Sequence, residues 1–355
     1  MSAQPRLRRL DRYVVSHVLE LTGIVALGLV TIYTLVVFVS DVNDSGKGYG
    51  PVEVLEYSLL MIPNSLYTLM PVVALLGTLL GVGLLARNGE LTAMRAAGVS
   101  LLRIGGATVL AGAALAVFSF MLGDWLVPAS EKLANSLRDT ARGVSAPAAA
   151  LWLRDADNVV RINDLEAEDH VRDVTIFKLS PDGRLQAASR VDEGRYADSH
   201  WHLSGVHSTS FGEEGTGVTS ATEQDFDSGI SPNVLKLFIL EAGNLSTAGL
   251  LRLIGYMDDN HLDASKYRLL LWRRLMEPLT VLAMMLFAVP FVTSQLRDTG
   301  AGQKLLAGAL IGIGFYVINK VSVSLGDIYQ WPAPLAAGLP TVALALLAWQ
   351  RLRKA

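Results

Sequence analysis

Six long apolar runs divide the chain, and each is close to the length that a membrane-crossing helix needs. They cover approximately residues 19–40, 58–86, 104–126, 275–295, 305–325 and 332–350. About 20 consecutive apolar residues cross the hydrocarbon core of a bilayer as a helix. The pattern therefore predicts six transmembrane helices in a three-plus-three arrangement. The first is expected to be an uncleaved helix, because no small-x-small cleavage site precedes the polar segment after Ser40.

Three amphipathic stretches flank these runs. Residues 127–142 and 246–258 have a helical pattern of apolar positions, and both are expected to rest at a membrane surface. A third stretch precedes the first run, with one apolar helical face made of Leu7, Leu10, Val14, Val15 and Val18. It is predicted to lie along the inner surface before the chain turns into the bilayer.

A polar block between the third and fourth runs has a β pattern. Short runs rich in β-branched and aromatic residues occur at 151–153, 159–162, 171–179, 184–189 and 200–206. Ser180-Pro-Asp-Gly183 is a turn sequence. The expected fold is thus a membrane α-helical protein with an inserted β-jelly-roll-like or sandwich domain. Its domains are residues 1–126 (helices 1–3), 127–263 (β domain with flanking amphipathic helices) and 264–355 (helices 4–6).

Composition supports a membrane protein, and the distribution of charge distinguishes the polar β block from the rest of the chain. Of 355 residues, 51% are hydrophobic, 18% are charged and none is cysteine, which excludes disulfides and thiol chemistry. The net charge of −3 combines −8 in residues 127–270 with +5 in the remainder. The basic residues form no patch, so nucleic-acid binding is not expected.

The distribution of Lys and Arg in short connections predicts the orientation, because cytoplasmic connections are enriched in them. Basic residues gather in the N-terminal segment, in 87–103, in 296–304 and in the C-terminal tail. The other connections, 41–57 and 326–331, have Lys47 as their one basic residue. Both termini are therefore expected in the cytoplasm and the acidic β block on the outer side.

The connection after the second run is a short helical element that carries Glu90. Its small and apolar residues suit insertion into a groove on a partner. From the residues alone, a solvated loop is favoured over that interpretation. The chain has no G-x-x-x-x-G-K-[ST] motif, so any ATP-driven activity requires another subunit.

Several motifs spread along the chain resemble the LptF/LptG permeases of the bacterial lipopolysaccharide exporter, and more closely the LptG branch. They are Leu10-Asp-Arg-Tyr13, Pro71…Leu75-Leu-Gly77, Leu85-Ala-Arg-Asn-Gly-Glu-Leu91, Met94-Arg-Ala-Ala-Gly98, Gly123-Asp-Trp125…Pro128, Leu151-Trp-Leu153 and Tyr267…Trp272…Pro278. The resemblance covers nearly the whole chain, including the interrupted helix layout.

The resemblance implies a non-catalytic permease subunit in the inner membrane of a Gram-negative bacterium. It implies a heterodimer with an LptF-like permease, an LptB-like ATPase dimer that uses the ATP and Mg²⁺, and LptC/LptA-like jelly-roll proteins that receive lipopolysaccharide. The chain itself would hold no cofactor. The implied contact with the ATPase is a coupling helix with Glu90, Leu91, Met94, Arg95, Ala97 and Gly98.

Lipopolysaccharide carries phosphates, so its carrier should present Lys or Arg beside an apolar cavity. Family members place basic residues at the outer end of helix one, but residues 36–44 contain no Lys or Arg. We therefore expect headgroup contact at Arg138, Lys320, Arg273, Arg274 and Lys47. For the cations within apolar runs, extension toward lipid headgroups is an equally good explanation.

Other features favour ordinary structural roles. Gly77 with Gly81, and Gly308 with Gly312, allow close helix approach, and Pro63, Pro71, Pro278 and Pro290 are expected at kinks. His200-Trp-His202 resembles part of a metal site, but an exposed strand face explains it better, and no metal or catalytic site is expected.

Two alternatives remain open from the sequence. One is a membrane-anchored sensor or scaffold with a ligand-binding β domain. The other is a mechanotransmission permease, whose usual layout of four helices with the outer domain after the first does not fit.

Overall fold

The chain folds into two compact units, which we describe separately. The computed structural model describes residues 4–43, 49–142, 151–167, 169–180, 182–212, 215–232, 234–235, 245–294 and 300–354. The helical unit comprises residues 1–142 and 265–355, and the β unit comprises residues 143–264. The predicted membrane helical fold with an inserted β domain is confirmed.

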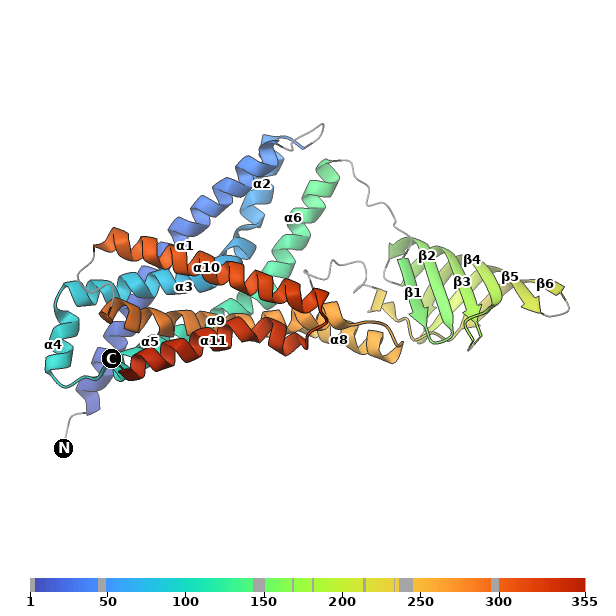
Figure 1. The fold of residues 1–355 in the computed structure, drawn as a ribbon. Coiled ribbons are helices and arrows are strands. Elements are labelled where there is room, and N and C mark those ends of the chain that lie inside the picture. The colour runs from blue at the N-terminus through green and yellow to red at the C-terminus, as the bar shows by residue number, and fades with distance from the viewer. Residues whose placement is uncertain are drawn as a thin grey trace. The chain divides into compact units, whose positions relative to one another are not determined.

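The helical unit contains six helices, among the described residues, that are long and apolar enough to cross a membrane. Its elements are α1 (Gln4–Asn43), α2 (Pro51–Leu60), α3 (Ile62–Arg87), α4 (Glu90–Ala96), α5 (Leu101–Met121), the π-helical turn η1 (Leu122–Leu126), α6 (Val127–Ala141), α9 (Ser265–Ser294), α10 (Ala301–Ile328) and α11 (Ala333–Lys354). The start of α1, α4 and the end of α11 lie at the same end of this unit (Figure 1).

Two predicted runs have different ends in the structure. The run 58–86 is divided at Met61, two residues before Pro63, so α2 and α3 are separate helices. The third run continues through η1 into α6, so residues 127–141 extend a membrane helix and pack against α2 in the helical unit. The boundary between the units therefore falls after Arg142, whereas residues 127–142 were expected with the β domain.

The first helix is continuous, which corrects the expected surface-lying N-terminal stretch. Residues 4–43 form one helix without an intervening turn, and Val14 and Val18 are buried in the core of the helical unit. The apolar face predicted for a membrane surface instead packs on this chain's own helices.

Glycines set the closest helix contacts. A Cβ at Gly77 or Gly81 of α3 would meet the backbone of Thr22 or Val18 in α1, and a Cβ at Gly308 of α10 would meet Leu76 and Leu79 of α3. Gly312 faces Val72 in the same way. Both glycine pairs therefore serve packing within this chain.

The β unit contains one antiparallel sheet whose described strands pair in chain order. They are β1 (Leu151–Asp155), β2 (Asn158–Ala167), β3 (His170–Leu179), β4 (Leu185–Ala197), β5 (His200–Gly212) and β6 (Gly215–Phe226). Five of these were predicted, with shorter extents. The sixth was missed because β6 is rich in Gly, Ser and Thr and is exposed along almost its whole length.

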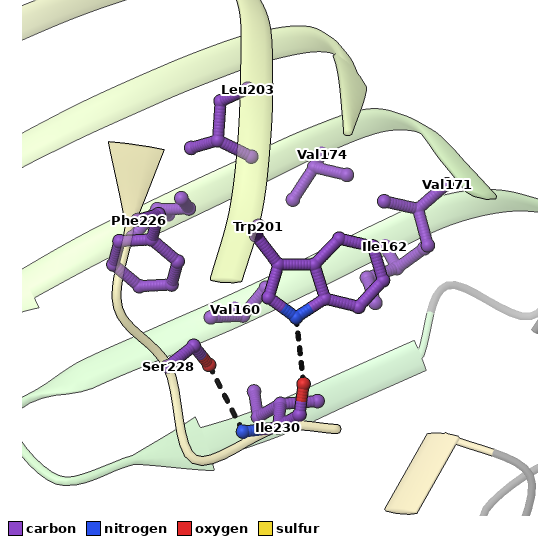
Figure 2. Close-up of a pocket in the computed structure, with 10 residues that line it drawn as sticks. Val160, Ile162, Val171, Val174, Trp201, Leu203, Phe226, Ser228 and Ile230 are labelled. Carbon is purple, nitrogen blue, oxygen red and sulfur yellow. Dashed lines mark hydrogen bonds between the residues drawn. The ribbon is translucent and has the colours of Figure 1, made fainter. Parts of the chain in front are cut away.

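One face of the sheet forms the core of the β unit. Trp201 is 5% exposed, and its indole N–H donates to the Ile230 carbonyl at 2.7 Å (Figure 2). Val160 points into this core together with Ile162, Val174 and Ile176. Helix α8 (Thr247–Asp259) contributes Tyr256, whose hydroxyl donates to the Arg154 carbonyl. Burial, with Asp155 nearby, raises the pKa of Tyr256 to about 12.

Candidate functional site: a groove beside an aromatic–cationic cluster

An apolar groove lies between α1, α2 and α3. Its volume is about 700 Å³, within the range of small-molecule pockets. Side chains of α1 between Gly23 and Phe38 form one wall, and Leu55 and Leu59 of α2 with Leu66 of α3 form the other. The second half of α1 extends away from the main bundle together with α2 and α6 (Figure 1).

The groove is apolar and open at its side. Two of its three hydroxyl residues, Thr31 and Ser58, donate to carbonyls of their own helices, so they present little polarity. Leu27 and Leu35 of the wall are 73% and 62% exposed. Such a surface suits hydrocarbon chains and excludes a site for a polar solute.

A cluster of tyrosines and arginines lies where α2 meets α6, and its Tyr57 directly precedes the groove residue Ser58 in α2. The Arg138 guanidinium lies 5.1 Å from the Tyr57 ring centre and donates to the Tyr57 hydroxyl at 3.3 Å. Arg142 lies 4.8 Å from the ring centre of Tyr49. We call these four residues the aromatic–cationic cluster. An Arg has five N–H donors, so both guanidinium groups keep donors for an anion.

Burial holds the tyrosines of the cluster neutral. Burial and the Asp41 carboxylate raise the pKa of Tyr49 to about 12, and Asp41 accepts the Tyr49 hydroxyl at 3.2 Å. Burial also raises the pKa of Tyr57, against the opposing effect of Arg138. The rings therefore serve as neutral supports that hold the two arginines.

Of the five expected headgroup residues, Arg138 lies in this cluster. Arg274 lies 3.6 Å from the Asp124 carboxylate, with 12% of its side chain exposed, so it is engaged inside the helical unit. Arg273 is exposed beside it, and Lys320 is exposed on α10 among apolar side chains. Lys47 lies outside the described residues. The structure thus brings together Arg138 with the unexpected Arg142, Tyr49 and Tyr57.

Three members of the cluster, Arg142, Tyr49 and Tyr57, were not predicted from the sequence. Arg142 is the last residue of the predicted amphipathic helix, and the tyrosines lie near a turn, where each has many ordinary explanations. A useful signal was the pair of tyrosines eight residues apart around Pro51, because Pro51 begins a helix that can present Tyr57 toward α6.

The expected coupling helix is α4, and its residues divide between two faces. Leu91 and Met94 are buried within this chain, so here they anchor α4 instead of facing outward. Arg95, Ala97 and Gly98 are exposed. Gly89 and Gly98 have φ of +77° and +87°, a conformation that favours glycine, so they fix the turns on both sides of the helix.

Glu90 is held by another part of the chain. Its carboxylate accepts the Tyr13 hydroxyl at 2.8 Å, and Tyr13 stacks on His17 at 6.0 Å between ring centres. Two residues before Tyr13, Asp11 accepts two hydrogen bonds from Arg103 at the start of α5. The Leu10-Asp-Arg-Tyr13 motif therefore contacts both flanks of the α4 connection.

The interior of the β sheet is filled in this structure. Trp201, Phe226 and Ile230 close its concave face and leave a cavity of about 20 Å³, room for one water molecule (Figure 2). Val160, Ile162, Val174 and Ile176 on this face are therefore core residues. His202 lies 2.6 Å from Asp225, and no group of three or more His, Cys, Asp or Glu side chains gathers as a metal site in the part of the chain that the structure describes.

Six apolar helices interrupted by an antiparallel β domain define a multi-pass membrane protein with a large inserted domain. Residues 12–354 match the family "Lipopolysaccharide export system permease LptF/LptG", and the chain belongs to this family. The family expected from the motifs is thereby confirmed.

The chain is similar to curated LptG proteins over nearly its full length. It is 27% identical to lipopolysaccharide export system permease protein LptG of Escherichia coli (strain K12) over 356 residues, which covers 97% of this chain and 98% of that protein. It is 27% identical to the LptG protein of Haemophilus influenzae over 346 residues, which covers 96% of this chain and 97% of that protein.

Proposed function

We propose that this chain is the permease subunit of an ATP-driven lipopolysaccharide exporter. It extracts lipopolysaccharide from the inner membrane and passes it to a bridge of β-jelly-roll domains toward the outer membrane. The observation that carries the proposal is the apolar groove beside the aromatic–cationic cluster. Acyl chains occupy the groove between α1 and α2, and Arg138 and Arg142 bind the headgroup phosphates.

The subunit works in a complex. An LptF-like permease faces α1 and α10, whose apolar side chains are exposed in this single chain, and completes the groove. An LptB-like ATPase dimer binds the exposed face of α4 and hydrolyses ATP. In this arrangement both termini are cytoplasmic, and the periplasmic β unit meets LptC/LptA-like partners.

Photo-crosslinking in membranes tests the groove. A photoreactive residue replaces Leu35, a groove residue, or Leu346 of α11, an apolar residue of similar exposure (56%) that does not line the groove. We expect lipopolysaccharide adducts from position 35 that decrease when the ATPase turns over, and few from position 346. Equal adducts at both positions would contradict a groove that binds the lipid.

Substitutions test the headgroup contact. Arg138→Ala should reduce the adduct at position 35 several-fold, while Lys132→Ala, on an exposed position of the same helix, should not. Failure to co-purify an ATPase with the chain would instead favour a sensor or scaffold. Adducts unaffected by Arg138→Ala together with Arg142→Ala would exclude the cluster as the headgroup site.

A further inference from the structure

The first turns of α1 contact both sides of the α4 connection. Asp11 accepts from Arg103 Nε at 3.2 Å and from Arg103 Nη2 at 3.0 Å, a two-point contact that fixes the direction of the guanidinium. Tyr13 donates to Glu90, the first residue of α4, at 2.8 Å. The Tyr13 contact therefore lies at the start of α4, and the Asp11 contact lies after its end, because Arg103 is in the first turn of α5.

These contacts define geometry more than they stabilise the fold. The side chains of Arg103 and Asp11 are 38% and 34% exposed, and ion pairs at such positions add little to stability. The anchoring of α4 by buried Leu91 and Met94 persists without them. They join the start of α1 to Glu90 at the start of α4 and to Arg103 at the start of α5.

Helix α1 connects this end to the groove without interruption. It has no proline after its first turn, so it is a stiff element. From Tyr13 to Phe38 it extends about 38 Å at 1.5 Å per residue. Between these points, Val18 and Thr22 lie against Gly81 and Gly77 of α3. This close contact with α3 therefore lies between the start of α1, which contacts Glu90 and Arg103, and the part of α1 that lines the groove.

We propose that Asp11 and Tyr13 are positioning residues that tie α4 to α1, so that a displacement of α4 tilts α1 about its contact with α3 and changes the width of the groove. Both act through residues of this chain, Asp11 through Arg103 and Tyr13 through Glu90. The proposal rests on the proposed function for the origin of the displacement and for the occupant of the groove.

Distance measurements test the tie independently of transport. The chain has no cysteine, so two nitroxide labels can be placed at exposed positions Ala93 of α4 and Ser16 of α1 in the full chain purified without the ATPase, whose proposed contact is the exposed face of α4. We expect one narrow distance distribution, which Asp11→Ala combined with Tyr13→Phe broadens. Arg12→Ala, an exposed neighbour on the same helix, is the matched control and should leave it narrow. An unchanged distribution in the double variant would overturn the proposal.

Transport measurements test whether these contacts couple ATP hydrolysis to the release of lipopolysaccharide. In the reconstituted complex, Asp11→Ala and Arg103→Ala should each lower lipopolysaccharide released per ATP hydrolysed several-fold while hydrolysis continues. The exchange Asp11→Arg with Arg103→Asp should restore most of that ratio, which a general loss of folding would not allow. An unchanged ratio in a variant with broadened distances would also overturn it. If the unmodified complex releases no lipopolysaccharide, the proposed function fails, and the label distances still decide whether α4 and α1 are tied.

Discussion

The Arg274 guanidinium of α9 lies 3.6 Å from the Asp124 carboxylate of η1, and the two side chains are 12% and 15% exposed. A charge pair at this depth joins the π-helical turn to the second helix triplet. Gly123, next to Asp124, has the Tyr67 ring where its Cβ would be. The turn between α5 and α6 is thus fixed by contacts from two other helices.

Removing one partner of this pair should lower the free energy of unfolding. Arg274→Ala leaves the Asp124 carboxylate without this cation, and breaking a buried pair in this way costs about 3–5 kcal/mol. We expect a clearly lower unfolding temperature of the purified chain in detergent. Lys132→Ala, at an exposed position of α6, is the control and should change it little. Equal effects of the two substitutions would show that the pair does not hold the turn.

The helices were predictable because each depends on a local property, a long apolar run. The π-helical turn was not predictable, because it depends on Tyr67 and Arg274, far from Gly123 in sequence. In the same way, the apolar pattern of β1 to β5 revealed those strands. Strand β6 has almost no buried side chain, so its sequence carries no alternation to detect.

The candidate site was predictable in its residue types and less so in its partners. Glu90 was expected from the motifs and Arg138 as a cation for the headgroup phosphates, but the side chains that contact them, Tyr13 and Tyr57, come from other helices. Leu91 and Met94 were expected to face a partner, yet they are buried in this chain. The apolar pattern of a seven-residue helix cannot distinguish burial within its own chain from burial against another.

The close contact between Gly77 and Thr22 predicts that the stability of the folded chain depends strongly on glycine at position 77. Gly77→Ala places a methyl group into the α1 backbone at this crossing, and overpacking of this kind costs about 1–3 kcal/mol. Gly106→Ala of α5 is the control, because open space surrounds that position and alanine favours a helix. We expect a lower unfolding temperature for the first variant and an equal or higher one for the second. A stable Gly77→Ala chain would mean that α1 and α3 do not cross so closely.

Tyr49 predicts a loss of stability in alkaline solution. Its pKa is raised to about 12 in the folded chain, while an unfolded tyrosine ionises near about 10. A raised folded pKa means that the stabilising contribution is complete below pH 10 and is lost as the pH rises from about 10 to 12. Tyr49→Phe should therefore show a smaller fall in unfolding midpoint between pH 9 and 11.

The control for this effect is Tyr329→Phe, which removes a phenol that is 67% exposed. It should keep the pH dependence of the unmodified chain. A spectrophotometric titration should also lose one late-ionising phenol in Tyr49→Phe. The same fall in midpoint for both variants would indicate that Tyr49 is not shielded by burial and Asp41.

The hydrogen bond from Trp201 to Ile230 should help to keep the buried face of the sheet covered. Trp201→Phe removes the N–H that donates to Ile230 and leaves that carbonyl unpaired, at a cost of about 1–3 kcal/mol. Hydrogen–deuterium exchange of β5 in the full chain should accelerate roughly 5- to 150-fold, since every 1.4 kcal/mol is a factor of ten. Trp152→Phe, at a position 55% exposed on the opposite face, should leave exchange nearly unchanged. Exchange unaffected by Trp201→Phe would mean that the concave face is already open in solution, and that hydrocarbon chains could enter it without displacing Ile230.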